Sequence, residues 1–161
     1  DTLAALPLHA RRVVIAPADA ATRALAIAAG AEVVENPEPA VGLGRSIACG
    51  VQSLPADTDG VLIMLGDMPQ AREAVALDLM AVFEALDAAA IVAPLHDGRR
   101  GHPVLFGAHH LPALAALTGD QGARDILQRA QVTLVPVADA GVLLDIDTPA
   151  DLAAAGRCDP S

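Results

Sequence analysis

The hydrophobic pattern of the chain centres on an apolar run, Val61 to Leu65, that ends abruptly on Gly66-Asp67-Met68-Pro69. Five consecutive large apolar residues without a helical or alternating period predict a strand buried on both faces, as in a parallel sheet covered by helices. Such a strand ends at the carboxyl edge of the sheet, where open α/β folds bind their ligands. Asp67 is therefore the first candidate functional residue; the competing interpretation is a plain turn former.

Similar apolar runs recur along the chain and alternate with segments of helical length. The runs predict strands at residues 11–16, 32–35, 60–65, 90–94, 104–107, 132–136 and 142–146. The intervening segments predict helices at 19–29, 45–54, 73–86, 109–117 and 122–130, and a final one beginning near Thr148. This alternation is typical of right-handed βαβ units. It predicts a single domain over residues 1–161, an α/β protein built as a Rossmann-like three-layer α/β/α sandwich with a mostly parallel sheet.

Composition narrows the class of protein. Of the 161 residues, 53% are hydrophobic, but much of this excess is alanine, and no apolar stretch reaches the roughly 18 residues of a membrane span. There is no signal-peptide pattern, and the two cysteines, Cys49 and Cys158, form neither a metal motif nor a disulfide framework. We therefore expect a soluble, cytoplasmic protein without a membrane partner.

The charge balance bears on the ligand. Ten basic against twenty acidic residues give a net charge of −10, which disfavours nucleic acid as a partner. A small phosphate ligand remains compatible, because Mg²⁺ can bridge carboxylates to phosphate oxygens. A second acidic turn, Asp145-Ile146-Asp147, follows a predicted strand, and either Asp145 or Asp147 could join Asp67 at such a metal ion. The competing interpretation of Asp147 is favourable charge beside a helix N-terminus.

A glycine-rich loop, Gly42-Leu43-Gly44-Arg45-Ser46, precedes the third predicted helix. Here backbone N–H groups converge, and small residues permit close approach of a ligand. A flexible helix entrance explains the two glycines equally well. Asn36 ends the preceding strand, where it could bind a base edge or form an Asx-turn.

Two further polar segments are candidates for anion binding. One glycine-rich loop in this hydrophobic chain holds Arg99, Arg100 and His102, which predicts an anion-binding lid. Asp120 and Arg124 lie four residues apart in the other segment. They could form a helix cap and a local ion pair, or they could contact substrate.

Taken in order, five blocks of the chain resemble the MobA-like nucleotidyltransferases, and among them most closely the molybdenum cofactor cytidylyltransferases. The blocks are Gly42–Ser46, Leu65–Pro69, Arg100–Phe106, Gly119–Arg124 and Asp145–Leu152. The resemblance spans nearly the whole chain, and five ordered blocks are more specific than any one of them. It implies a GT-A-like fold and the transfer of a nucleoside monophosphate, CMP from CTP, to a phosphorylated acceptor with release of pyrophosphate.

The resemblance also implies roles for individual residues. The catalytic, Mg²⁺-binding carboxylates would be Asp67 and Asp147. The residues that contact base and ribose would be Asn36, Gly42, Gly44 and Ser46. The residues that face the phosphate of molybdopterin, or of a related acceptor, would be Arg99, Arg100, His102, Asp120 and Arg124.

One departure from the family concerns the Gly-rich, Arg- and Lys-containing loop that follows its first strand and wraps the triphosphate. No segment of this sequence matches that loop, and the chain contains no lysine. We expect an upstream segment that carries the first strand and the loop, and without it we expect no activity.

A second departure concerns the choice of nucleotide. Gly66-Asp67-Met68-Pro69 differs from the Gly-Asp-Gln-Pro associated with cytidylyl transfer, so GTP or another nucleotide is an alternative to CTP. A further alternative is a non-catalytic accessory module that binds a nucleotide or a pterin. If the chain is an enzyme, a molybdoenzyme that receives the finished cofactor is an expected partner.

Overall fold

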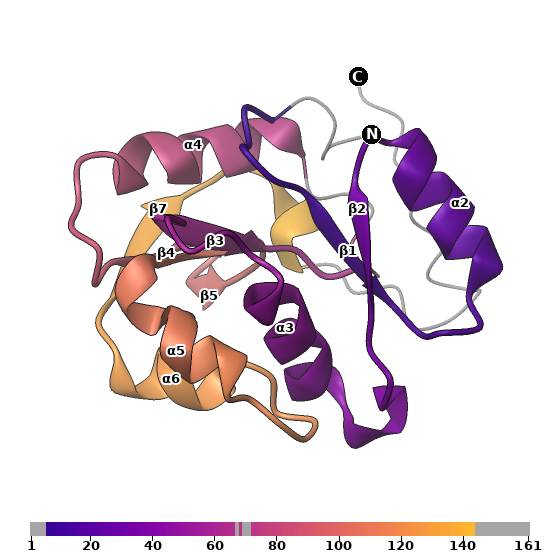
Figure 1. Cartoon of the computed structure of the whole chain (residues 1–161). Coiled ribbons are helices and arrows are strands. Elements are labelled where there is room, and N and C mark those ends of the chain that lie inside the picture. The colour runs from indigo at the N-terminus through magenta and orange to yellow at the C-terminus, as the bar shows by residue number, and fades with distance from the viewer. Residues whose placement is uncertain (1–5, 67, 69–71, 144–161) are drawn as a thin grey trace.

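The structure is a computed structural model that describes residues 6–66, 68 and 72–143 (Figure 1). The strands are β1 (Arg12–Ile15), β2 (Glu32–Glu35), β3 (Gly60–Ile63), β4 (Ile91–His96), β5 (Arg99–Arg100), β6 (Val104–Gly107) and β7 (Val132–Pro136). The α-helices are α2 (Ala20–Ala28), α3 (Leu43–Gln52), α4 (Glu73–Phe83), α5 (Leu111–Ala115) and α6 (Arg124–Arg129). Three short 3₁₀ helices are η1 (Pro39–Val41), η2 (Ala108–His110) and η3 (Ala140–Leu143).

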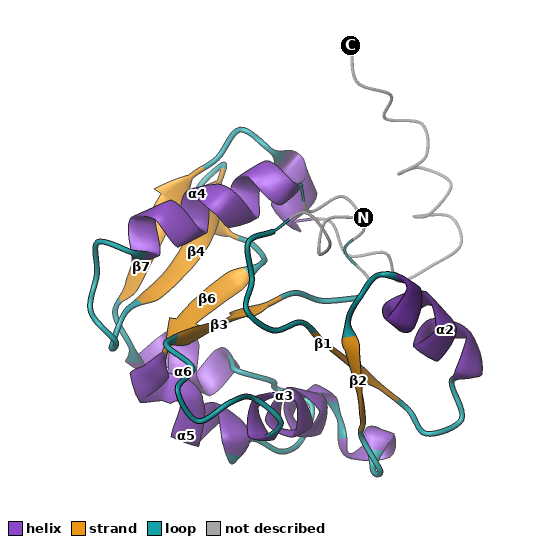
Figure 2. Cartoon of the chain, turned by 45° about the horizontal axis from the view of Figure 1, so that its top comes forward, coloured by secondary structure: helices purple, strands orange, loops and turns teal. Residues whose placement is uncertain are grey.

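The strands form two sheets, which Figure 2 shows side by side. β1 and β2 pair in parallel, and α2 lies beside them. In the second sheet β6 lies between β3 and β4, while β5 and β7 both pair with β4. The expectation of a mostly parallel sheet is not confirmed. Among the strand pairs that the structure describes, β3–β6, β4–β6 and β4–β5 are antiparallel and only β1–β2 and β4–β7 are parallel. For the β4–β5 pair the reason is local, because a two-residue turn joins these strands and a parallel pair needs a long crossover connection.

Two hydrophobic cores lie on opposite faces of the larger sheet, as the period of two along a strand requires. Ile91 of β4 and Phe106 of β6 belong to one core, together with apolar residues of α3, α5 and α6. Their sequence neighbours Val92 and Leu105 belong to the other core, with Leu79 of α4. Figure 1 shows the same three layers, with α4 on one side of the sheet and α3, α5 and α6 on the other. The layered α/β arrangement expected from the sequence is thus confirmed.

β3 corresponds to the apolar run at the centre of the hydrophobic pattern, but it is shorter and less buried than expected. It ends at Ile63, and all four of its residues are only half-buried. Within the described residues β3 pairs with β6 alone, so its other edge has no strand beside it. The expectation of a strand buried on both faces is wrong for β3, although it describes β6 and the first four residues of β4.

The polar loop expected after β4 is a β-hairpin that carries β5. Asp97 and Gly98 form its two-residue turn, with φ of 48° and 74°. Two successive positive φ angles are typical of the Asp-Gly type I′ turn, whose twist matches that of the flanking strands. The turn places Arg99 and Arg100 opposite His96 and Leu95.

The predicted strand at residues 142–146 is wrong where the structure describes it. η3 covers Ala140–Leu143 instead, and residues 144–146 lie outside the described part of the chain. The Asp139 side chain accepts a hydrogen bond from the Gly141 amide at 2.8 Å, which favours a turn over an extended strand. Among the helices that the structure describes, none is long and apolar enough to cross a membrane.

Candidate active site

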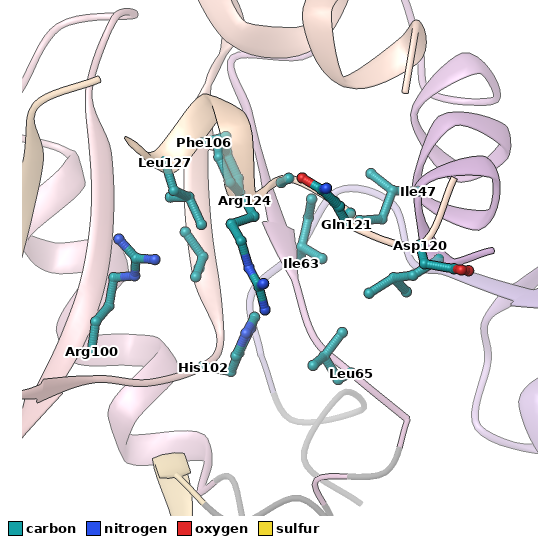
Figure 3. A pocket seen from close by; sticks show the side chains of 14 residues that line it. Ile47, Ile63, Leu65, Arg100, His102, Phe106, Asp120, Gln121, Arg124 and Leu127 are labelled. Carbon is teal, nitrogen blue, oxygen red and sulfur yellow. The ribbon is translucent and has the colours of Figure 1, made fainter. Parts of the chain in front are cut away.

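A pocket of about 300 Å³ opens between the larger sheet and helices α3 and α6 (Figure 3). This volume lies at the lower end of the roughly 300–1,000 Å³ range of small-molecule sites. The apolar lining residues are Leu43, Ile47, Ile63, Leu65, Val104, Phe106, Ala123 and Leu127. The remaining lining residues are Arg100, His102, Asp120, Gln121, Gly122 and Arg124. Four of the five residues predicted to face the acceptor therefore meet at one pocket.

The basic side chains of this pocket come from β5, the segment that follows it, and α6. Arg100 lies on β5, His102 follows it, and Arg124 is the first residue of α6. In Figure 3 the Arg124 side chain extends toward His102. Of the ion pairs in the described part of the chain, none includes Arg100 or Arg124. In a chain with net charge −10, two guanidinium groups free of carboxylate partners make this pocket a local site for an anion.

Asp120 lines the pocket, but its carboxylate has a different orientation. In Figure 3 it points away from Arg124. Its Oδ1 lies so close to the backbone of Gly42 that a Cβ there would come within 2.1 Å of it. No ion pair joins Asp120 to Arg124, both of which the structure describes, and α6 has no side-chain cap at Ala123. The expected local cap and ion pair are therefore not found.

The segment that presents Arg100 and His102 is held by backbone contacts. The Gly101 amide donates a hydrogen bond to the Pro94 carbonyl, and the His102 amide donates one to the Val142 carbonyl, each at 2.9 Å. A Cβ at position 101 would lie 2.4 Å from that Val142 oxygen, so only glycine fits. The glycine beside His102 is thus explained by close packing on η3.

Of the five residues predicted to face the acceptor substrate, Arg99 is the one that does not line the pocket. It is exposed on β5, opposite His96. Arg99 and Arg100 are consecutive residues of one strand, so their side chains point to opposite faces of the hairpin. Only Arg100 lines the pocket.

Asn36 and Ser46, predicted to contact the nucleotide, form a buried connection between β2 and α3. The Asn36 side chain is 1% exposed. Its amide nitrogen donates to Ser46 Oγ at 3.0 Å, and its Oδ1 accepts from the Glu38 amide at 2.9 Å. The second bond is the Asx-turn that the sequence offered as an alternative to base contact. Neither Asn36 nor Ser46 lines the pocket.

Gly42 and Gly44, the other two predicted nucleotide residues, bring the start of α3 against the turn at 118–120. Gly42 has a φ of 112°, which an L side chain rarely adopts. The Gly44 amide donates a hydrogen bond to the Gly119 carbonyl at 2.8 Å. The segment predicted to contact the nucleotide and the segment predicted to face the acceptor are therefore in direct backbone contact.

Two parts of the pocket were not singled out from the sequence: Gln121, which lies within the predicted Gly119–Arg124 block, and the apolar wall formed by Leu43, Ile47, Val104 and Phe106. Gln121 carries an amide with both donors and an acceptor, and it lines the pocket next to Ile47 in Figure 3. Leu43 and Ile47 lie four residues apart on α3, and Val104 and Phe106 lie two apart on β6. These are the spacings of one helix face and one strand face, but the predicted helix began at residue 45 and left Leu43 in the glycine-rich loop.

The predicted metal ligands Asp67 and Asp147 lie outside the described residues, as does the alternative ligand Asp145. Within the described ranges, no group of three His, Cys, Asp or Glu side chains could hold a metal ion. The expected metal site stays a prediction that depends on these aspartates.

Comparison with known proteins assigns the chain to a family. Residues 1–134 match the family model of the MobA-like NTP transferase domain. The chain belongs to the MobA-like NTP transferase family. The family resemblance inferred from the five sequence blocks is thereby confirmed.

Two curated relatives share part of this MobA-like chain. The purine catabolism protein PucB of Bacillus subtilis is 31% identical over 112 residues, which are 67% of this chain and 53% of PucB. The molybdenum cofactor cytidylyltransferase of Escherichia coli is 29% identical over 119 residues, 74% of this chain and 59% of that protein. The chain therefore spans somewhat more than half the length of either relative.

A solved structure shares the fold. The manganese complex of Rv0371c from Mycobacterium tuberculosis superimposes with a TM-score of 0.73 at 26% identity, covering 91% of this chain and 77% of Rv0371c. The MobA-like domain thus has the architecture of a protein that has been solved with a bound divalent metal.

Proposed function

We propose that this MobA-like protein is a nucleotidyltransferase that moves CMP from CTP onto the phosphate of molybdopterin, with release of pyrophosphate. The observation that carries this proposal is the pocket at Arg100, His102 and Arg124, which brings two guanidinium groups and an imidazole together in an acidic chain. Guanidinium groups match the geometry of phosphate oxygens, which they bind through paired N–H donors. Beside them lies an apolar wall, which suits the planar ring of a pterin, a group less polar than the phosphate.

In the proposed reaction an oxygen of the acceptor phosphate attacks the α-phosphorus of CTP. A new P–O bond forms, the bond between the α-phosphorus and its bridging oxygen to the β-phosphate breaks, and pyrophosphate leaves with that electron pair. Transfers of this type need little covalent chemistry from the protein, which contributes position and charge stabilisation. Arg100, His102 and Arg124 would hold the attacking phosphate and offset its charge.

Asp67 and Asp147 are the proposed ligands of a divalent metal ion, Mg²⁺ or Mn²⁺, which would neutralise charge on the triphosphate. The manganese bound by Rv0371c supports a divalent cation in this fold. Asn36, Gly42, Gly44 and Ser46 are proposed to shape the nucleotide side of the site. Asn36 and Ser46 would act through the loop that they hold, because their side chains bond to one another.

The proposal extends to the cellular setting. The protein would act in the cytoplasm and pass the finished cofactor to a molybdoenzyme.

Two alternative functions would give different experimental results. A guanylyl or other nucleotidyl transfer would use a different triphosphate, and an accessory module would bind a nucleotide or pterin without turnover.

The test is pyrophosphate release by full-length protein, incubated with Mg²⁺ and molybdopterin and with each nucleoside triphosphate in turn. We expect release that requires molybdopterin and is fastest with CTP. Fastest release with GTP would replace the cytidylyl assignment by the guanylyl one. Tight binding of a triphosphate or of molybdopterin without release under any condition would favour the accessory module.

A further inference from the structure

The start of α3 packs very closely on the turn at residues 118–122. Contact with a nucleotide alone would not require such close packing. A Cβ added to Gly42 would lie 2.6 Å from the Gly119 carbonyl carbon, and one added to Gly44 would lie 2.7 Å from the Thr118 carbonyl oxygen. Contacts under 3.0 Å with backbone atoms are essentially never found for a real Cβ. The turn could not approach α3 this closely if either residue carried a side chain.

The contact continues into the pocket wall. Gly122 lies against the same helix, where an added Cβ would be 3.1 Å from Leu43 Cδ2 and 3.5 Å from Ile47 Cδ1. Both of these α3 side chains line the pocket, and Arg124 follows Gly122 by two residues. The place of Arg124 in the pocket therefore depends on how closely the turn packs on α3.

We propose that Gly42 and Gly44 are positioning residues for the acceptor half of the site. They hold the 118–122 turn on α3 through the bond from the Gly44 amide to the Gly119 carbonyl, and they thereby place Arg124 beside His102. This inference rests on the proposed function for the identity of the acceptor. It changes the role expected for the two glycines, from ligand contact to setting the geometry of a second ligand's pocket.

The discriminating variant is Gly44→Ala, with Gly50→Ala as its matched control on the same helix. A Cβ at position 50 meets only Val14 Cγ2, at 3.1 Å, on the side of β1. The probe is inorganic phosphate, whose dissociation constant is measured by calorimetry and by NMR shifts of the Arg124 side chain. We expect about 10- to 100-fold weaker phosphate binding in Gly44→Ala, since displacement of the turn would remove the hydrogen bond of Arg124 to the charged phosphate. Binding by Gly50→Ala should match that of the wild type.

The kinetic counterpart separates positioning from general destabilisation. In Gly44→Ala the KM for molybdopterin should rise at least about tenfold, and by a larger factor than the KM for CTP. A folded Gly44→Ala protein that binds phosphate as well as Gly50→Ala overturns the inference and leaves the proposed function intact. Wild-type protein that binds phosphate but releases no pyrophosphate overturns the proposed function, and the variant comparison still decides the inference.

A measurement on the wild type covers the case in which Gly44→Ala does not fold. Hydrogen exchange at the Gly44 amide reports directly on its bond to the Gly119 carbonyl. Phosphate in the pocket should slow exchange at Gly44 together with the amides of residues 121–124. Slowing at 121–124 with unchanged exchange at Gly44 would overturn the inference.

Discussion

Asn36 shows at the scale of one residue how a buried polar group can connect two elements. Its side chain is 1% exposed and bonds both to Ser46 of α3 and to the Glu38 amide. Burial strengthens such bonds and makes a missing partner costly. We therefore assign Asn36 first to the geometry of the nucleotide loop, and only through that loop to the ligand.

Replacement of Asn36 by alanine tests this assignment. Asn36→Ala should lower the free energy of unfolding by about 1–3 kcal/mol, because it leaves the Glu38 amide and the Ser46 hydroxyl without their partner. The measurement is urea unfolding followed by circular dichroism. Gln52→Ala is the control, since its bond to the Ala115 carbonyl is exposed, and it should cost less. Equal stability of Asn36→Ala and wild type would contradict the assignment.

The proposed metal ligands give a second prediction at this scale. Asp67→Asn and Asp147→Asn should each abolish Mg²⁺-dependent pyrophosphate release and leave the circular dichroism spectrum unchanged, because an amide is a poorer ligand for a hard cation than a carboxylate. The Asp145→Asn variant decides between the two aspartates of the second acidic turn. A near-normal rate in any one variant would remove that residue from the metal site.

The sequence predicts the site residues that have a local signal, but not those placed by contacts between distant segments. Arg100, His102 and Arg124 were found because charged groups in glycine-rich segments stand out in a hydrophobic chain, and the structure brings them to one pocket. The orientation of Asp120 could not be predicted, because it depends on packing between segments more than seventy residues apart. Gln121 carries no charge and no spacing that would have singled it out.

At the scale of elements, α2 begins with a side-chain cap that titrates. Hydrogen bonding with the Thr22 side chain, and then the hydrogen bond that Asp19 accepts from the Thr22 amide at 2.9 Å, hold the pKa of the Asp19 carboxyl below the ordinary value. A carboxyl whose folded pKa is lowered stabilises the fold above its unfolded pKa of about 4, and the effect is lost as pH falls through the folded value.

The cap predicts a pH-dependent stability difference. Wild type should exceed Asp19→Ala in free energy of unfolding at neutral pH, and the gap should narrow as the pH falls below about 4. Asp19→Asn keeps an acceptor for the Thr22 amide but does not titrate, so its advantage over alanine should stay constant with pH. Urea unfolding at several pH values measures both. A wild-type advantage unchanged in acid would contradict the account.

Elements whose signal is local were predicted best. β2, β6 and β7 have the predicted bounds, because each is a short segment with β-branched residues followed by a turn or helix signal. The expected parallel direction was not confirmed in the larger sheet, because β6 lies between β3 and β4 and runs antiparallel to both. The β5 hairpin was missed although Asp97-Gly98 is a strong local signal for a type I′ turn. The turn at Asp139 and Gly141 overrode the apolar run at 142–146 where it is described.

At the scale of the whole molecule, charge separates the pocket from the rest of the protein. The chain has a net charge of −10, yet the pocket presents Arg100, His102 and Arg124. A local positive site in an acidic protein admits a phosphate ligand while the overall field repels polyanions such as nucleic acid. This contrast is the physical basis for the proposal that the acceptor is a small phosphorylated molecule.

The most direct test of this claim is the specificity of Arg124→Gln compared with Arg129→Gln, an exposed arginine later on the same helix. Both variants remove one positive charge from α6, but only Arg124 lines the pocket. Steady-state pyrophosphate release by full-length protein gives kcat/KM for molybdopterin and the KM for CTP. For Arg124→Gln we predict kcat/KM for molybdopterin lower by about 10- to 100-fold, the effect of losing a hydrogen bond to a charged group, with an unchanged KM for CTP. Arg129→Gln should match the wild type, whereas equal kcat/KM for molybdopterin in the two variants would contradict an acceptor phosphate in this pocket.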